Sequence, residues 1–125
     1  MEIIKSVIDE IPEEIYRVLD EIGVPAHMKA YDYIAYASTL LINDTTHRIC
    51  VTQDIYPEIS KEFNTSYSCV ERAIRTAINY VFSNTDPELL FLYFGNSVPL
   101  NKSKVPNSQF VYTVARIARR QLIKS

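Results

Sequence analysis

Hydrophobic residues recur along this chain at the spacing of three and four residues that marks one face of an α-helix. In the segment 12–23 they form a stripe, with Pro12 where a helix begins and Gly23 where it ends. A long apolar-rich segment, 27–42, predicts a second helix, and 49–56 predicts a short helical piece. No segment alternates apolar and polar residues in the manner of a half-buried strand. The pattern therefore predicts an all-α fold, a compact bundle of about six helices.

The segment 57–76 has the pattern of a helix-turn-helix. Pro57 suits the first position of a helix of about two turns, because its fixed φ is already helical. Asn64 falls where a tight turn needs a residue that tolerates a positive φ. A longer helix follows and is predicted to end at 83–85. In DNA-binding proteins of this type, the second helix enters the major groove.

The start of the longer helix has more than one interpretation. Ser68, with Glu71 three residues later, predicts a capping box in which Ser68 is the N-cap. Thr65 and Ser66 are alternatives that would start the helix earlier. In either case the apolar positions predict one buried stripe, formed by Val70, Ala73, Ile74, Ala77, Ile78, Val81 and Phe82.

The opposite face of the longer helix carries Glu71, Arg72, Arg75, Thr76 and Asn79, whose spacing keeps them together. These residue types suit the major groove. An arginine donates two hydrogen bonds to guanine, a glutamate accepts one from cytosine, and a good bidentate pair discriminates by roughly 1–3 kcal/mol. The alternative is an ordinary amphipathic helix, in which Glu71 caps its own N-terminus and pairs with Arg75. On this pattern we favour DNA reading.

A chain of 125 residues with 47% apolar content fits a single domain, 1–125. A core of this size is stable without disulfide bonds or structural metal ions. Cys50 and Cys69 lack the cysteine and histidine pairing that zinc sites use, so we expect reduced thiols, no metal and no cofactor. The longest apolar run, 89–94, is too short to cross a membrane. Because the N-terminus has no export signal, we expect a cytoplasmic protein without a membrane partner.

The net charge is −2, but the charges are unevenly distributed. Residues 1–21 hold seven acids against two basic residues, whereas residues 95–125 hold six basic residues and no acid. This asymmetry suits a molecule with one surface that meets phosphates and another that faces away from them. The alternative is a solvated C-terminal helix whose cations lie near its negative dipole end.

The residue types present in the chain also argue against catalysis. His27 and His47 are isolated, and the two glycines of the chain cannot form a Gly-rich phosphate loop. The carboxylates cluster in the acidic N-terminal segment rather than in pairs beside a pocket. We therefore expect that the protein is not an enzyme.

Several motifs follow one another along the chain: Gly23-Val-Pro-Ala-His-Met-Lys29, Tyr56-Pro57, Phe63-Asn-Thr65, Val70-Glu-Arg-Ala-Ile-Arg75, Phe94-Gly95, Lys102, Lys104 and Pro106-Asn-Ser108. Together they resemble the C-terminal DNA-binding effector domain of the master response regulators of sporulation initiation in endospore-forming Firmicutes. The resemblance covers residues 10–125 without large gaps. Its most specific part is the string Val-Glu-Arg-Ala-Ile-Arg that follows Phe-Asn-Thr.

The resemblance implies an all-α, six-helix domain of the winged-helix-like effector type. Such a domain binds a short promoter element of double-stranded DNA as head-to-tail dimers and contacts the sigma subunit of RNA polymerase. Glu71 and Arg72 match base-reading positions, Arg75 matches a neighbouring position beside phosphate, and Ser68 matches a position at the DNA backbone. The loop before the last helix resembles a second phosphate-contacting element. The implied DNA-binding residues are Ser68, Cys69, Glu71, Arg72, Arg75, Thr76, Lys102, Lys104, Asn107 and Ser108.

Two of these positions depart from the family pattern. Cys69 stands where the family usually has a base-reading arginine, and a thiol cannot donate a guanidinium fork. Losing one such contact costs about 1–3 kcal/mol, so we expect a relaxed operator preference with backbone binding retained. Thr76 stands where the family often has histidine, which is a smaller change. A redox-sensing Cys69 is an alternative, but a plain buried or interface thiol is favoured.

The regulators that this chain resembles also carry an N-terminal receiver domain, and nothing in this sequence could build one. We expect a stand-alone paralogue rather than an excised domain. We hypothesise that the acidic helical leader, 1–11, replaces the receiver as a dimerisation or partner surface, because it combines acids with an apolar stripe. Deletion of 1–11 without a change in oligomeric mass or operator affinity would contradict this hypothesis.

Two alternatives concern protein partners. The chain could be a protein-interaction module, or an antagonist of a full-length regulator, that kept the fold and lost specific DNA reading. The segment 89–94 is apolar on every side and must be buried or offer a patch to a partner. For this segment we favour core packing over a contact with the sigma subunit or with another copy.

Overall fold

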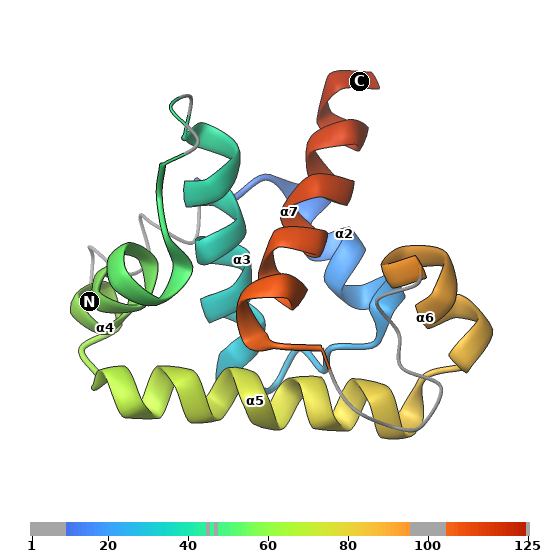
Figure 1. The fold of residues 1–125 in the computed structure, drawn as a ribbon, viewed down its shortest axis with the longest axis horizontal. Helices are drawn as coiled ribbons and strands as arrows, with labels where there is room; N and C mark the ends of the chain where they lie inside the picture. The colour runs from blue at the N-terminus through green and yellow to red at the C-terminus, as the bar shows by residue number, and fades with distance from the viewer. Residues whose placement is uncertain (1–9, 45, 47, 96–104, 125) are drawn as a thin grey trace.

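The computed structural model describes residues 10–44, 46, 48–95 and 105–124. Every regular element in these ranges is a helix (Figure 1). In chain order they are α2 (Glu13–Ile22), α3 (Lys29–Asn43), the π-helical turn η1 (Val51–Ile55), α4 (Tyr56–Glu62), α5 (Tyr67–Asn84), α6 (Pro87–Phe94) and α7 (Asn107–Lys124). The 6 α-helices, and the lack of strands in these ranges, confirm the predicted all-α bundle. Residues 1–9 of the acidic leader, together with Lys102 and Lys104, lie outside the described residues.

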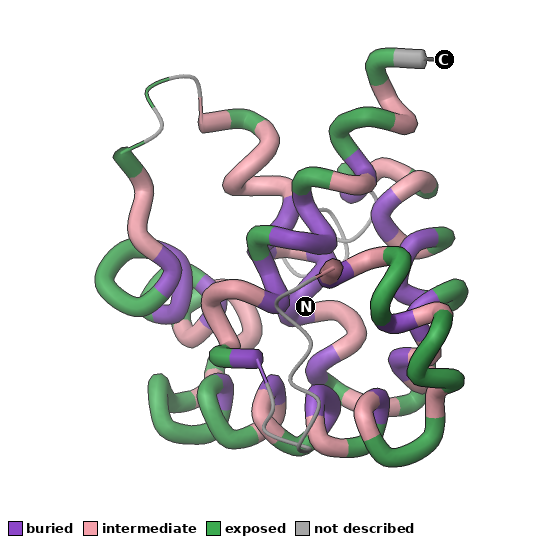
Figure 2. Tube along the Cα trace, turned by 45° about the vertical axis from the view of Figure 1, so that its right-hand side comes forward, coloured by how far each residue is buried: buried purple, intermediate pink, exposed green. Residues whose placement is uncertain are grey.

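The longest apolar stripes meet at the centre of the bundle. In Figure 1, α5 lies along one edge of the molecule, while α7 begins beside it and runs away toward the C-terminus. Helices α3 and α7 pack on each other, and both contact α5. Figure 2 shows buried residues gathered where the helices face one another and exposed residues on their outer sides. This arrangement leaves the outer face of α5 open to solvent along the edge of the molecule.

The end of α2 follows the predicted pattern. Gly23 ends the helix at φ 103°, the left-handed conformation expected of a C-terminal glycine, and its N–H donates to the Leu19 carbonyl at 3.0 Å. A Cβ at this position would lie 2.6 Å from Oγ1 of Thr85, which itself donates to the Ile22 carbonyl at 2.9 Å. The absence of a side chain at Gly23 therefore allows the segment after α5 to pack against the end of α2.

The turn between α4 and α5 also has the predicted backbone. Asn64 adopts φ 52°, in agreement with its expected role in the tight turn. The Phe63 ring packs edge-on against Tyr33 of α3, with ring centroids 5.1 Å apart. Across the same corner, Tyr56 and Tyr67 form a second edge-on pair at 5.4 Å. These aromatic contacts fix α4 and α5 relative to each other and to α3.

The start of α5 differs from the favoured prediction. Ser66, not Ser68, is the N-cap: its extended backbone precedes Tyr67, and its Oγ accepts a hydrogen bond from the Cys69 N–H at 3.1 Å. The prediction of Ser68 as the cap is therefore wrong, and the alternative at Ser66 is confirmed. The third helical residue is then Cys69 rather than a glutamate, so no capping box forms at Ser68. Ser68 instead lies exposed in the first turn.

The predicted buried stripe of α5 is largely confirmed. Ala73 and Phe82 are partly buried, and five residues of the stripe are fully buried: Val70, Ile74, Ala77, Ile78 and Val81. Burial of a valine or isoleucine side chain stabilises the fold by roughly 1.5–3 kcal/mol. The stripe therefore fixes which face of α5 points to solvent.

Helix α6 is only partly covered. Asp86 caps it by accepting a hydrogen bond from the Glu88 N–H at 2.9 Å, and Leu90 and Phe94 are buried as core packing requires. Phe91 and Leu92, however, are 56% and 79% exposed. Core packing thus accounts for one side of the predicted apolar segment and leaves an apolar patch on the other.

In the described part of the chain, no helix is long and apolar enough to cross a membrane.

Candidate nucleic-acid interface

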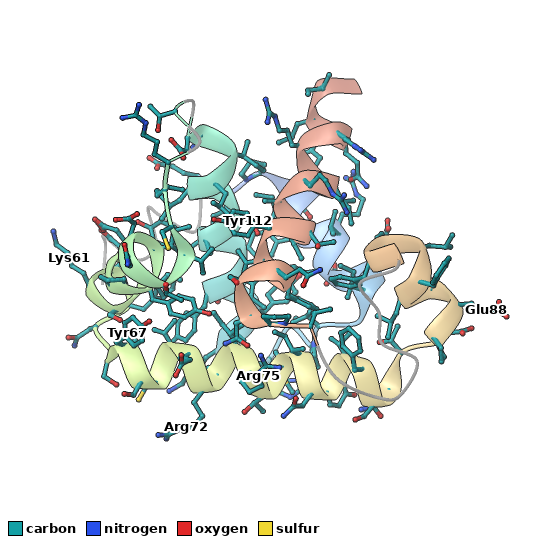
Figure 3. All side chains as sticks on the ribbon, in the orientation of Figure 1. Lys61, Tyr67, Arg72, Arg75, Glu88 and Tyr112 are labelled. Carbon is teal, nitrogen blue, oxygen red and sulfur yellow. The ribbon has the colours of Figure 1, made fainter. Side chains whose placement is uncertain are left out.

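The outer face of α5 presents most of the residues that the sequence assigned to DNA. Five side chains on it are exposed: Ser68, Cys69, Glu71, Arg72 and Thr76. Figure 3 shows Arg72 extending away from the body of the molecule. Within the described residues Arg72 donates no hydrogen bond to the protein, so all of its N–H groups are available to a ligand.

Arg75 has a different environment from Arg72. It is half-buried and lies on the side of α5 that faces the start of α7 (Figure 3). Its guanidinium donates a hydrogen bond to the Val105 carbonyl at 3.3 Å. Val105 is itself 1% exposed, so this bond joins α5 to a buried residue just before α7. Part of the donor capacity of Arg75 is therefore used inside the protein.

A second hydrogen bond joins the same two elements. Asn107, the first residue of α7, donates through Nδ2 to the backbone carbonyl of Glu71 at 3.1 Å. Asn107 and Ser108 thus lie beside the first half of α5, as the predicted site requires. Between the elements runs a groove of about 560 Å³, lined by Thr52, Tyr56, Ser68, Glu71, Arg72, Arg75, Pro106, Asn107 and Ser108.

The polar groups of this α7-side groove suit an anion. Arg72 and Arg75 bring two positive charges, and the start of an 18-residue helix, α7, adds the positive end of its dipole. Tyr56 also lines the groove, but its side chain is fully buried, and this burial raises the pKa of its hydroxyl. Glu71 is the one carboxylate among the lining residues. The groove combines hydrogen-bond donors and two positive charges with one carboxylate.

Cys69 is exposed on the flank of α5 that faces α3, so Cys69 is not a buried thiol, and an interface thiol stays a prediction. Hydrogen bonds from Ser66 and Thr65, and the nearby charge of Arg72, lower the pKa of the thiol below its usual range. Cys69 lines a groove of about 350 Å³ between α5 and the start of α3. The sequence did not indicate this groove.

A comparison with known protein families decides the kind of domain. Residues 15–117 match the family model described as sporulation initiation factor Spo0A C terminal. The chain belongs to this family. The match runs from α2 through most of α7, and it confirms the resemblance that the sequence motifs carried.

Membership of the Spo0A C-terminal family places this chain among DNA-binding regulator domains rather than among enzymes. The family motifs contribute residues to the exposed face of α5 and to the start of α7. The fold brings these two parts of the chain together. Within the described ranges, no cluster of three or more metal-binding side chains occurs. The described side chains around α5 offer mainly hydrogen-bond donors and positive charge.

Proposed function

We propose that this chain is a sequence-specific DNA-binding transcription regulator that places α5 in the major groove. The observation that carries the proposal is the position of Arg72, which is exposed and extended on the face of α5 opposite the buried stripe and makes no hydrogen bond to the described part of the chain. An 18-residue helix is about 27 Å long at 1.5 Å per residue, and the major groove, about 12 Å wide, admits an α-helix.

The base-reading roles fall to Arg72 and Glu71. The Arg72 guanidinium can donate two hydrogen bonds to O6 and N7 of a guanine, and the Glu71 carboxylate can accept one from N4 of a cytosine. Glu71 is held in place because its carbonyl accepts the Asn107 amide. Thr76 and Cys69 lie along the same exposed surface and make smaller contacts.

The backbone-contacting roles fall to the α7-side groove. The groove is lined by Ser68, in the first turn of α5, and by Ser108, in the first turn of α7. Their hydroxyls can donate hydrogen bonds to phosphates of one DNA strand. Arg75 adds positive charge to the groove while its bond to Val105 is kept. The sequence also assigns Lys102 and Lys104 to this phosphate-contacting loop. Their assignment stays a prediction.

The remaining roles extend this proposal. We expect residues 1–125 to act as one DNA-binding unit in the cytoplasm, with promoter DNA as the partner. A homodimer on DNA and a contact with the sigma subunit of RNA polymerase remain predictions from the family resemblance. The exposed Phe91 and Leu92 of α6 support a protein contact at that surface, because clustered apolar residues mark interaction sites.

The second candidate is a protein-interaction module that lost specific DNA reading. Two observations favour it: Cys69 in place of the family arginine, and the apolar patch at Phe91 and Leu92. Such a module would still carry the fold of the family. It would bind a protein partner, including a full-length regulator, in preference to DNA.

Binding-site selection on random duplexes, followed by titration across salt concentrations, separates the two candidates. A DNA reader should bind the selected duplex at least about 10³-fold more tightly than random DNA. Its affinity should fall with salt with a logarithmic slope of about −3 or steeper, which corresponds to three or more phosphate contacts. Equal weak affinity for both duplexes, with a shallow slope, would reject DNA reading and leave the interaction module.

A further inference from the structure

The groove on the α3 side of α5 is formed by two helices that are far apart in sequence. From α3 it is lined by Lys29, Ala30 and Tyr33, and from α5 by residues that include Cys69 and Arg72. Lys29 is the first residue of α3 and is exposed. Its ammonium therefore stands at the mouth of a concave surface beside the exposed face of α5.

The charge of this α3-side groove is positive. Lys29 and Arg72 are its two cations, and none of the residues that line it is a carboxylate. The nearest acid of the first turn of α3, Asp32, is not among the lining residues of this groove; it accepts a hydrogen bond from the Tyr16 hydroxyl at 3.1 Å and, with Lys29, lines the neighbouring hollow beside Phe63. The groove thus offers an anion two positive groups, from two different helices.

The two grooves flank the same stretch of helix. Arg72 lines both of them, so the line of α5 that contains Arg72 separates the α7-side groove from the α3-side groove. The major groove of DNA is bounded by two phosphate backbones, one on each strand. When a helix enters it, each flank of that helix turns toward one strand. The α7-side groove then faces one backbone, and the α3-side groove faces the other.

We propose that Lys29 binds a backbone phosphate of the DNA strand opposite to the strand contacted by the start of α7. The inference rests on the proposed function, since it needs α5 in the major groove. An ammonium at this position neutralises a phosphate and reads no base. Together the two grooves hold α5 from both sides and set its register on the duplex.

Measurement of the salt slope tests this contact. Lys29→Gln removes the charge with little change in size, and Lys29 is exposed, so the fold is unaffected. On the duplex selected by wild type, the slope of log affinity against log salt should become shallower by about 0.9, the value for one lost phosphate contact. The ratio of affinities for selected and random duplexes should stay unchanged, and Lys29→Arg should restore the slope.

Arg120→Gln is the matched control. Arg120 is also exposed and belongs to the second half of α7 (Asn107–Lys124). That half of the helix runs away from α5 (Figure 1). Its loss removes one positive charge from the protein without removing one from either groove. The control should leave the salt slope as in wild type, so a local contact is distinguished from a change in net charge.

Duplexes with single uncharged methylphosphonate links locate the contact. One such link, on the strand opposite to the α7 contact, should weaken binding by wild type and have no further effect on Lys29→Gln. A wild-type protein with a steep slope and a Lys29→Gln variant with the same slope would overturn the inference while leaving the proposed function intact. A changed selected sequence for Lys29→Gln would also overturn it. Failure of the proposed function is recognised separately, by a shallow slope in wild type.

Discussion

Arg75 is predicted to stabilise the fold, although it lies on the face of α5 that was assigned to DNA. The perturbation is Arg75→Met, which keeps the apolar stem and removes the guanidinium that donates to the Val105 carbonyl at 3.3 Å. Hydrogen bonds to charged groups contribute about 1.5–3 kcal/mol. Because Arg75 is half-buried and partly screened by solvent, we expect a loss of about 1–2 kcal/mol in the free energy of unfolding.

Urea denaturation followed by far-UV circular dichroism measures this loss. The midpoint should fall with an unchanged m-value, because the surface exposed on unfolding is the same. In thermal melts the same loss lowers Tm by roughly 3–10 °C for a domain of this size. The control is Arg72→Met. Arg72 is exposed and makes no hydrogen bond within the described residues, so its stability should stay within about 0.5 kcal/mol of wild type.

Equal stability of Arg75→Met and Arg72→Met would contradict a stabilising role for the Arg75 bond, because the two arginines would then have the same structural role. The consequence for binding follows from the same bond. Loss of the Arg75 bond loosens the segment before α7, so affinity for selected and random duplexes should fall by the same factor. A specific loss on the selected duplex alone would instead assign Arg75 to base reading.

Three further predictions concern the elements that position the site. Ser66→Ala should lower the free energy of unfolding by about 0.5–2 kcal/mol through loss of the N-cap, whereas Ser68→Ala should change it by less than about 0.5 kcal/mol; urea denaturation of both variants checks this. Gly23→Ala should cost about 2 kcal/mol or more, measured in the same way, because φ is +103° and the new Cβ would lie 2.6 Å from Oγ1 of Thr85. Hydrogen bonds lower the pKa of Asp44 to about 2, below its ordinary value, so its stabilising effect is present above about pH 4 and is lost as pH falls toward about 2. Acid titration of wild type should show this loss, and Asp44→Asn should abolish that part of the pH dependence.

The sequence predicted the features of the site that depend on local chemistry. The buried stripe of α5 follows from the periodicity of apolar residues, because a helix repeats its faces every 3.6 residues. Gly23 and Asn64 were correctly placed at the end of a helix and in a turn, since few residues tolerate positive φ. The all-α class followed from the same patterns.

The features that sequence reasoning missed arise from tertiary contacts or from equivalent local choices. Ser66 and Ser68 have the same side chain, so either could cap the helix. Only the backbone conformation of the preceding turn decides which of them is the N-cap. The bond from Arg75 to the Val105 carbonyl joins residues that no local pattern connects. The α3-side groove at Lys29 depends on how α3 packs on α5, so the motif that ends at Lys29 marked the family without locating the groove.

Binding-site selection with wild type and Arg72→Ala in parallel shows whether α5 reads DNA through Arg72. Arg72→Ala should fold as wild type does, lose the preference at one guanine position and discriminate there less well by about 1–3 kcal/mol, while binding to random DNA is largely retained. An unchanged selected sequence with unchanged affinity would contradict the assignment of α5 as the recognition helix.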